Sequence, residues 1–398
     1  MPPVRSPSGK KERFEPLDGW RAIACLLVVF THTGFTLGWS PLWLWGYCGV
    51  HGFFVLSGFL LFLPFCEAIL GHREFPNVKH YYIRRAWRIF PAYLLALCVF
   101  SGLRVITNAS PPTASSFVTH ALLIFNFFDR AEFFAINPVF WTLAIEGQFY
   151  VILPIASWLA YRGSSHRPQL ALVSMIGVLF AVGIASRAGE FFATTQEYSS
   201  TPTFVRFRLI TSYLDLFACG MVVCVMYVKR SSLAGAVRIS PAFLLAVGGL
   251  LVLAANYWST RTAPQGWLIS NDFAYTLGFA PLLCAGLAAL LWVTVAERTG
   301  IERWLAFPLL VFLGRISYSI YLFHVLVQIP MFRLLPLEFL PDNQIKNFAW
   351  GLISLLPTVC IAAIVYRFVE EPFIRHAAAI TGRTTAVVVN LQTQTDAA

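Results

Sequence analysis

Charged side chains are scarce in this sequence: Asp, Glu, Lys and Arg make up 12% of its 398 residues, whereas 58% are hydrophobic. A soluble protein of this length needs a more polar surface, so the composition argues against a chain of two or three soluble domains. Apolar runs of membrane-spanning length recur from end to end. We therefore predict an all-α polytopic membrane protein, located as a multi-pass protein in the cell (inner) membrane.

The sequence also lacks metal-ligand spacings, a paired extracellular cysteine pattern and internal repeats. Its eight cysteines fall almost wholly inside the apolar runs, where they are expected to pack as free thiols. The net charge of +10 is spread over the loops between these runs, which indicates attraction to anionic membrane lipids. We expect no metal site and no nucleic-acid partner.

Ten apolar runs are predicted to be membrane spans. They cover residues 17–39, 47–69, 89–107, 139–160, 170–186, 207–228, 241–258, 273–295, 308–330 and 347–368. An eleventh run, 117–135, is interrupted by polar residues between Asn126 and Glu132. A re-entrant or interfacial segment is therefore expected there instead of a full crossing.

The lysines and arginines predict the orientation of these spans. Many more of them fall in segments on the side of the N-terminus than in segments on the other side, so we expect both termini in the cytoplasm. The first run is long and lacks a small-x-small exit site, so no cleaved signal peptide is expected. The predicted organisation is a cytoplasmic tail over 1–16, a transmembrane domain over 17–372 and a short disordered cytoplasmic tail over 373–398.

Two ionisable residues, Arg21 and His32, lie inside the first apolar run. Eleven residues of helix make almost three full turns, so the two side chains share one helix face with ~16 Å of rise between them. Asp18 is three residues before Arg21 and can pair with it. Ionisable groups inside a membrane usually mark a functional site, and a buried neutral imidazole is a competent general base. The plainer alternative is a histidine that only hydrogen-bonds to a neighbouring helix.

The second run carries Ser57 among small residues at Gly49, Gly52 and Gly58. Small residues let helices approach closely, so packing is the favoured interpretation of this pattern. Ser57 itself is expected either to hydrogen-bond across helices or to line a cavity.

A cluster of arginines, Arg84, Arg85 and Arg88, precedes the third run. Arg85 and Arg88 are three residues apart, on one helix face at the expected cytoplasmic surface. Two guanidinium groups in this arrangement suit phosphates. Ordinary positive-inside anchoring explains the cluster equally well.

Polar residues also interrupt the fourth and ninth runs. Glu146 in the fourth run has Tyr150 one turn further on, and a carboxylate at this depth needs a partner or a water-filled cavity. In the ninth run, Ser317, Tyr321 and His324 recur at helical spacing. This polar stripe must face protein or water.

Taken together, these segments resemble the acyltransferase-3 family of integral membrane O-acyltransferases of carbohydrates. The resemblance spans nearly the whole chain, because six motifs occur in the order that the family has. They are Leu-Asp-Gly-Trp-Arg21 with His32, Phe53 to Phe59, Arg84 to Pro91 with Tyr93, Trp141 to Glu146 with Tyr150, Ser317 to His324, and Glu370-Glu-Pro372.

The resemblance implies transfer of an acyl group, commonly acetyl from acetyl-CoA, to a carbohydrate hydroxyl. The acyl-CoA is then a donor substrate and not a permanently bound cofactor. The family's essential histidine corresponds to His32, and its supporting arginine corresponds to Arg21. The Arg-x-x-Arg element, which is thought to help bind the donor, corresponds to Arg85 and Arg88, with Arg84 beside them.

We therefore expect acyl-CoA to enter from the cytoplasmic side and His32 to deprotonate a hydroxyl of a glycan or glycoconjugate, such as O-antigen or exopolysaccharide. Glu146 is expected to fix a sugar hydroxyl or the histidine. The expected substrate-binding residues are Ser57, Tyr150, Tyr321 and His324. Direct transfer and an acyl-enzyme route through His32 or Ser57 both remain open.

Other functions fit the sequence less well. A transporter or flippase of a lipid-linked sugar would also use buried ionisable residues, but the chain shows no repeated halves. A sensor with a degenerate site is disfavoured because the ionisable residues of the motifs are intact. A macrolide or other small molecule is an alternative acceptor, because the sequence does not identify the acceptor, the acyl chain or the oligomeric state.

Overall fold

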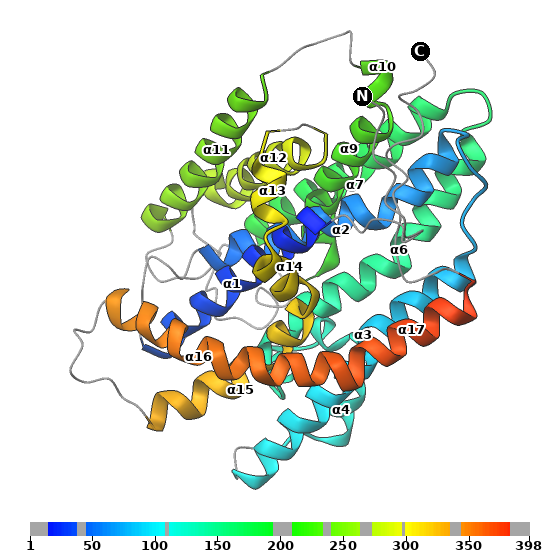
Figure 1. The fold of residues 1–398 in the computed structure, drawn as a ribbon. Coiled ribbons are helices and arrows are strands. Elements are labelled where there is room, and N and C mark those ends of the chain that lie inside the picture. The colour runs from blue at the N-terminus through cyan, green and yellow to red at the C-terminus, as the bar shows by residue number, and fades with distance from the viewer. Residues whose placement is uncertain are drawn as a thin grey trace, which may run out of the picture.

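The computed structural model describes residues 15–37, 45–107, 111–193, 209–233, 240–262, 273–296, 299–334 and 344–382. The elements of these segments are all helical, which confirms the predicted fold class (Figure 1). They are α1 (Glu15–Leu37), α2 (Trp45–Ile69), α3 (Val78–Ile106), α4 (Ala114–Ala121), η2 (Phe125–Phe127), α5 (Arg130–Phe133), η3 (Pro138–Phe140), α6 (Trp141–Gly163), α7 (Pro168–Ala193), η4 (Ile210–Tyr213), α9 (Leu214–Val228), α10 (Arg230–Leu233), α11 (Pro241–Thr262), α12 (Phe273–Ala296), α13 (Ile301–Leu305), α14 (Pro308–Arg315), α15 (Ser317–Leu334), α16 (Gln344–Val365), η5 (Tyr366–Glu370) and α17 (Glu371–Ile380).

Within the described segments, eight helices are long and apolar enough to cross a membrane, or nine if one bent pair forms a single span. The eight are Gly46–Ile69, Val78–Ile106, Pro138–Gly163, Pro168–Phe192, Ile210–Val228, Pro241–Trp258, Gly278–Ala296 and Phe348–Ile380. The chain is thus a multi-pass membrane protein with fewer clear spans than the ten predicted.

The difference from ten lies in the first and ninth predicted spans. α1 forms as a helix, but it carries charged residues near its start and is not among the eight. The ninth span is broken, because α14 and α15 meet at an angle of 75°. The weak eleventh run divides into the short helices α4, η2 and α5, which are too short to cross a bilayer.

Two helix boundaries also differ from the predicted ones. α3 begins at Val78, eleven residues before the predicted third span, so the arginine cluster lies within the same helix as that span. At the other end of the chain, α17 extends to Ile380 and therefore includes the first residues of the expected disordered tail, 373–398. Residues 383–398 lie outside the described part.

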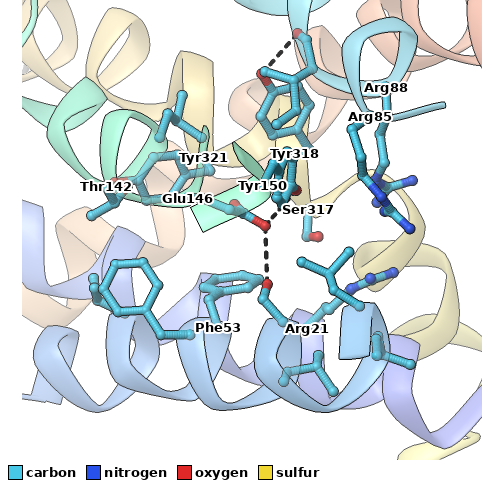
Figure 2. Close-up of a pocket in the computed structure, with 18 residues that line it drawn as sticks. Arg21, Phe53, Arg85, Arg88, Thr142, Glu146, Tyr150, Ser317, Tyr318 and Tyr321 are labelled. Atoms are coloured by element: carbon cyan, nitrogen blue, oxygen red, sulfur yellow. Dashed lines mark hydrogen bonds between the residues drawn. The ribbon is translucent and has the colours of Figure 1, made fainter. Parts of the chain in front are cut away.

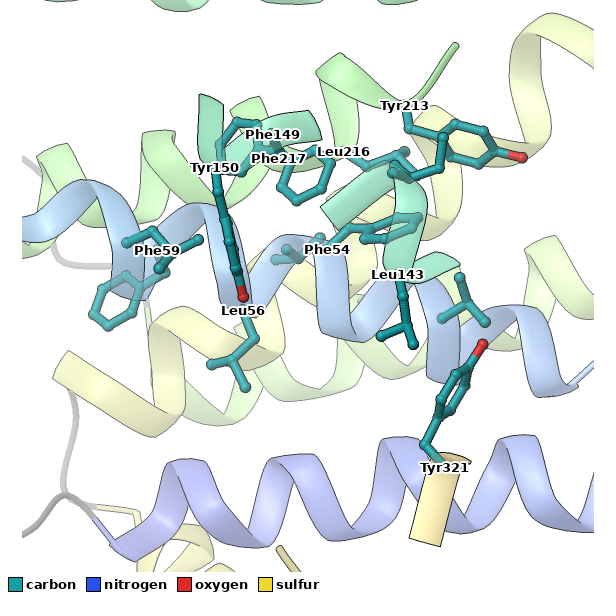
Figure 3. Packing of buried hydrophobic residues seen from close by; sticks show 14 of the residues in the cluster. Phe54, Leu56, Phe59, Leu143, Phe149, Tyr150, Tyr213, Leu216, Phe217 and Tyr321 are labelled. Atoms are coloured by element: carbon teal, nitrogen blue, oxygen red, sulfur yellow. The ribbon is translucent and has the colours of Figure 1, made fainter. Parts of the chain in front are cut away.

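Close helix packing holds α2 at the centre of the molecule. A Cβ atom added to Gly58 would lie 2.1 Å from the carbonyl oxygen of Phe217 on α9, and one added to Gly220 would lie 1.9 Å from that of Val55. Aromatic rings fill the adjoining core, where Phe149 of α6 stacks on Phe217 with ring centroids 3.8 Å apart (Figure 3). Gly58 of the second run thus allows the close approach of α2 and α9.

The long helix α3 lies beside α17 (Figure 1). Trp87 of α3 stacks on Phe373 of α17 at 5.1 Å between ring centroids. A π-helical turn, η5, joins α16 to α17 and ends at the buried residue Glu370. Such turns reorient one side chain relative to a regular helix and are frequent at functional sites.

Candidate active site

A cavity of about 90 Å³ lies between α1, α2, α3, α6 and α15. Seven of the ten predicted site residues line it, although they come from five separate helices. These seven are Arg21, Ser57, Arg85, Arg88, Glu146, Tyr150 and Tyr321. The other three predicted residues, His32, His324 and Arg84, are not among the lining residues.

The carboxylate of Glu146 occupies the middle of the cavity (Figure 2). Tyr150, one turn further along α6, donates its hydroxyl to Oε1 of Glu146 at 2.7 Å. Ser57 of α2 donates its hydroxyl to the same oxygen at 3.0 Å. These two donors offset part of the cost of keeping a carboxylate among membrane helices.

Three arginines, Arg21, Arg85 and Arg88, line one end of the cavity, which we call the basic end (Figure 2). The guanidinium carbon of Arg85 lies 5.7 Å from the ring centroid of Tyr81 and 5.8 Å from that of Tyr150. Its buried Nε has no hydrogen-bond partner among the residues that the structure describes. A cation held between aromatic rings with an unused donor is suited to an anionic ligand.

Thr142 and Tyr321 line the opposite end, which we call the tyrosine end (Figure 2). Their hydroxyls are hydrogen-bonded to each other, and Tyr321 also donates to the carbonyl oxygen of Val139 at 2.7 Å. Between the two ends the cavity follows α2 from Leu61 to Val50, a rise of ~16 Å for eleven residues of helix.

His32 lies outside the cavity, next to His324. The two rings are 4.8 Å apart and meet edge to face. Nδ1 of His32 is 2.8 Å from the carbonyl oxygen of Val28, and Nδ1 of His324 is 2.8 Å from that of Tyr321. Because a carbonyl oxygen only accepts, each Nδ1 carries a proton, so in the neutral form of each ring the lone pair is on Nε2.

Tyr321 connects this histidine pair to the cavity. Its ring centroid lies 5.9 Å from that of His324, while its hydroxyl reaches the cavity wall at Thr142. His324 is fully buried, and its Nε2 has no hydrogen-bond partner within the described part of the chain. Arg21 and His32 share one face of α1 but have different surroundings: Arg21 lines the cavity, and His32 packs against His324 outside it.

Three further polar residues line the cavity although we did not predict them as site residues: Thr142, Ser317 and Tyr318. Thr142 lies one turn before Glu146 on α6, so the spacing that relates Glu146 to Tyr150 would also have found it. Tyr318 donates its hydroxyl to the carbonyl oxygen of Ile89 at 2.9 Å and so ties α15 to α3.

Glu370 belongs to the last of the six motifs but was not predicted as a site residue, and it does not line the cavity. It is 1% exposed, and the Ser319 hydroxyl donates to its carboxylate. Arg88 is the cation whose charge acts on this carboxylate. This charge interaction connects Glu370 to Arg88, one arginine of the basic end.

The fold and the cavity place this chain among multi-pass membrane proteins that keep a polar site between their helices. A model of the acyltransferase-3 family, described as an acyltransferase domain, matches residues 15–367. Because the match covers most of the chain, the chain belongs to this family. The resemblance drawn from the six motifs is confirmed.

Curated relatives are similar along most of this chain. O-acetyltransferase OatA of Staphylococcus aureus strain NCTC 8325 is 25% identical over 372 residues, which are 89% of this chain and 56% of the relative. SAS0844 of strain MSSA476, described as an O-acetyltransferase, is 26% identical over 386 residues, or 92% of this chain and 58% of the relative. The chain thus spans a little over half the length of these relatives. No solved structure matches.

Proposed function

We propose that this protein transfers an acyl group, acetyl in the first instance, from acyl-CoA to a hydroxyl of a glycan or glycoconjugate. The observation that carries the proposal is the cavity that joins the arginines of the basic end to Glu146, Thr142 and Tyr321. Membership in an acyltransferase family and relatives named as O-acetyltransferases support it.

The basic end is the proposed site of the donor's phosphates. Arg85 and Arg88 stand one turn apart on α3, and both line the cavity together with Arg21. Guanidinium groups bind phosphate oxygens through paired, charge-assisted hydrogen bonds. Arg84 does not line the cavity, so we assign it to membrane-surface anchoring instead.

The length of the cavity supports the same placement. The arm that joins the phosphates of CoA to its sulfur contains about thirteen bonds and spans ~15 Å when extended. The cavity follows α2 for ~16 Å. Phosphates at the basic end therefore put the thioester near Tyr321, on the side of the histidine pair.

His32 is the proposed general base. Its Nε2 keeps a lone pair, because Nδ1 donates to Val28, and it can take the proton of an acceptor hydroxyl. The hydroxyl oxygen then attacks the thioester carbon, the carbon–sulfur bond breaks, and the leaving thiolate takes the proton from His32 to give free CoA. Tyr321 separates the cavity from the histidine pair, so its side chain must turn aside for the thioester to meet the acceptor.

The proposed function is tested by purifying the full chain and adding acetyl-CoA together with glycans extracted from the source cells. We expect release of free CoA and acceptor molecules heavier by one acetyl group, both dependent on His32. Mass spectrometry of surface glycans from cells with and without the chain identifies the acceptor. Full transfer by a well-expressed His32→Ala variant would remove His32 from this role.

A further inference from the structure

Glu146 lies away from the tyrosine end, where the acyl transfer is proposed to occur, so the transfer itself gives this residue no role. Glu146 lies one helical turn, ~6 Å, from Thr142 at the tyrosine end, and Ser57, which donates to it, lies four residues, ~6 Å, from Leu61 at the basic end. In Figure 2 its carboxylate stands between Arg85 on one side and Tyr321 on the other. A donor bound as proposed has its thioester beyond Glu146, so this carboxylate faces the middle of the arm.

The middle of that arm contains two secondary amides. Counted in extended bonds from the phosphate, their nitrogens lie at ~7 and ~12 Å, so the first lies near the level of Glu146 and the second lies beyond it. An amide N–H that leaves water for a membrane-embedded cavity needs an acceptor, because an unsatisfied donor there is costly. A carboxylate is an acceptor only, with about four lone-pair positions.

The hydrogen bonds of Glu146 favour this role over that of a base. Oε1 already accepts from Ser57 and Tyr150, which fixes the orientation of the side chain. The hydrogen bonds that the structure gives to Glu146 all end on Oε1, so Oε2 is the oxygen presented to a ligand. A fixed acceptor is suited to recognition, and an oxygen that already accepts two hydrogen bonds is poorly placed to take a proton.

We propose that Glu146, held by Ser57 and Tyr150, is the binding site for the amide-containing arm of the donor. The donor class is then a thioester whose arm carries secondary amides, as in a phosphopantetheine group. The inference rests on the proposed function and deepens it: the arginines bind the phosphates, and Glu146 binds the arm and sets its depth in the cavity.

The test measures binding and not turnover. Two ligands separate the arm from the phosphates: CoA carries both, whereas adenosine 3′,5′-bisphosphate carries phosphates without the arm. For the full chain in lipid nanodiscs we expect Glu146→Gln to weaken CoA binding about 10- to 100-fold and to leave bisphosphate binding as in the wild type. Arg85→Ala is expected to weaken both ligands.

Glu132 offers a matched control. Its carboxylate also accepts from two hydroxyls, those of Ser116 and Thr119, but it does not line the cavity. Glu132→Gln therefore removes a similar charge from a similar setting, and we expect wild-type affinity for CoA. An equal loss in Glu132→Gln would mean that the effect at Glu146 is structural, which contradicts the inference.

Two milder variants keep the test decisive if Glu146→Gln fails to fold. Ser57→Ala and Tyr150→Phe each free the carboxylate from one anchor, so each is expected to weaken CoA binding several-fold and bisphosphate binding not at all. Unchanged CoA affinity in both variants, or a wild type that binds the bisphosphate as tightly as CoA, would overturn the role of Glu146. Failure of the wild type to bind either ligand would instead contradict the proposed function.

Discussion

The two ionisable residues on one face of α1 have very different surroundings. Arg21 lines a cavity with Arg85 and Arg88, a site that is already shaped for an anionic ligand. His32 packs against His324 outside that cavity, and Tyr321 stands between them and it. We propose that the two ends of this helix have different roles: the Arg21 end binds the donor, and the His32 end activates the acceptor. Tyr321 is the boundary.

The largest expected effect is at the histidine end. His32→Ala removes the proposed base, so we expect kcat to fall about 10²- to 10⁴-fold. Because His32 does not line the cavity, CoA affinity should stay within about two-fold of the wild type. Steady-state kinetics and equilibrium binding on the same preparation separate the two quantities. Similar losses of kcat and of CoA affinity would contradict separate roles for the Arg21 end and the His32 end.

A loss of the opposite kind is expected at the basic end. Arg88→Ala removes one phosphate-binding guanidinium, so KM for acetyl-CoA should rise about 10- to 100-fold while kcat at saturation changes much less. Arg84→Ala is the comparison variant, because Arg84 belongs to the same cluster but does not line the cavity. Its effect should be clearly smaller. Equal effects of the two variants would show that general positive charge, and not the cavity, binds the donor.

The boundary residue can be changed in two directions. Tyr321→Phe removes the hydrogen bonds to Thr142 and Val139 and should leave the rate within several-fold of the wild type, because the ring can still turn aside. Tyr321→Trp enlarges the side chain between the cavity and His324, so transfer should fall more than ten-fold with CoA affinity retained. A fully active tryptophan variant would show that the thioester does not pass this residue.

The smallest effect concerns two adjacent glutamates of the motif at the end of the chain. Glu370 is buried at Ser319 and acts on Arg88, whereas Glu371 forms surface ion pairs with Arg367 and Arg375. Glu370→Gln should raise KM for acetyl-CoA several-fold by loosening Arg88. Glu371→Gln should have little effect, because exposed ion pairs contribute ~0–1 kcal/mol. Equal kinetics of the two variants would show that Glu370 does not support donor binding through Arg88.

Helical spacing predicted the parts of this site that lie within one helix. It placed Arg21 and His32 on one face, paired Arg85 with Arg88, and put Tyr150 one turn from Glu146. It could not predict the bond between Ser57 and Glu146, which are 89 residues apart, because contacts between helices depend on packing. The position of His32 outside the cavity has the same cause.

The same limit applies to the fold. Composition was sufficient for the class, since apolar runs of spanning length leave few other solutions. The number of spans was harder to predict from the sequence. The ninth run is apolar enough on average to be one span, although Arg315 and Ser317 interrupt it, and its mean hydropathy does not reveal the 75° break between α14 and α15. The third helix also begins earlier than its apolar run, because a helix begins where its capping residue lies: Asn77 accepts from the N–H of His80.

A structure of the full chain with a non-hydrolysable acetyl-CoA analogue tests the donor's course most directly. We predict its phosphates within hydrogen-bond distance of Arg85 and Arg88, an arm amide at Oε2 of Glu146, and its sulfur next to Tyr321. Phosphates at any other site, or a sulfur that stops at the basic end, would contradict the assignment of one end of α1 to the donor and the other to the acceptor.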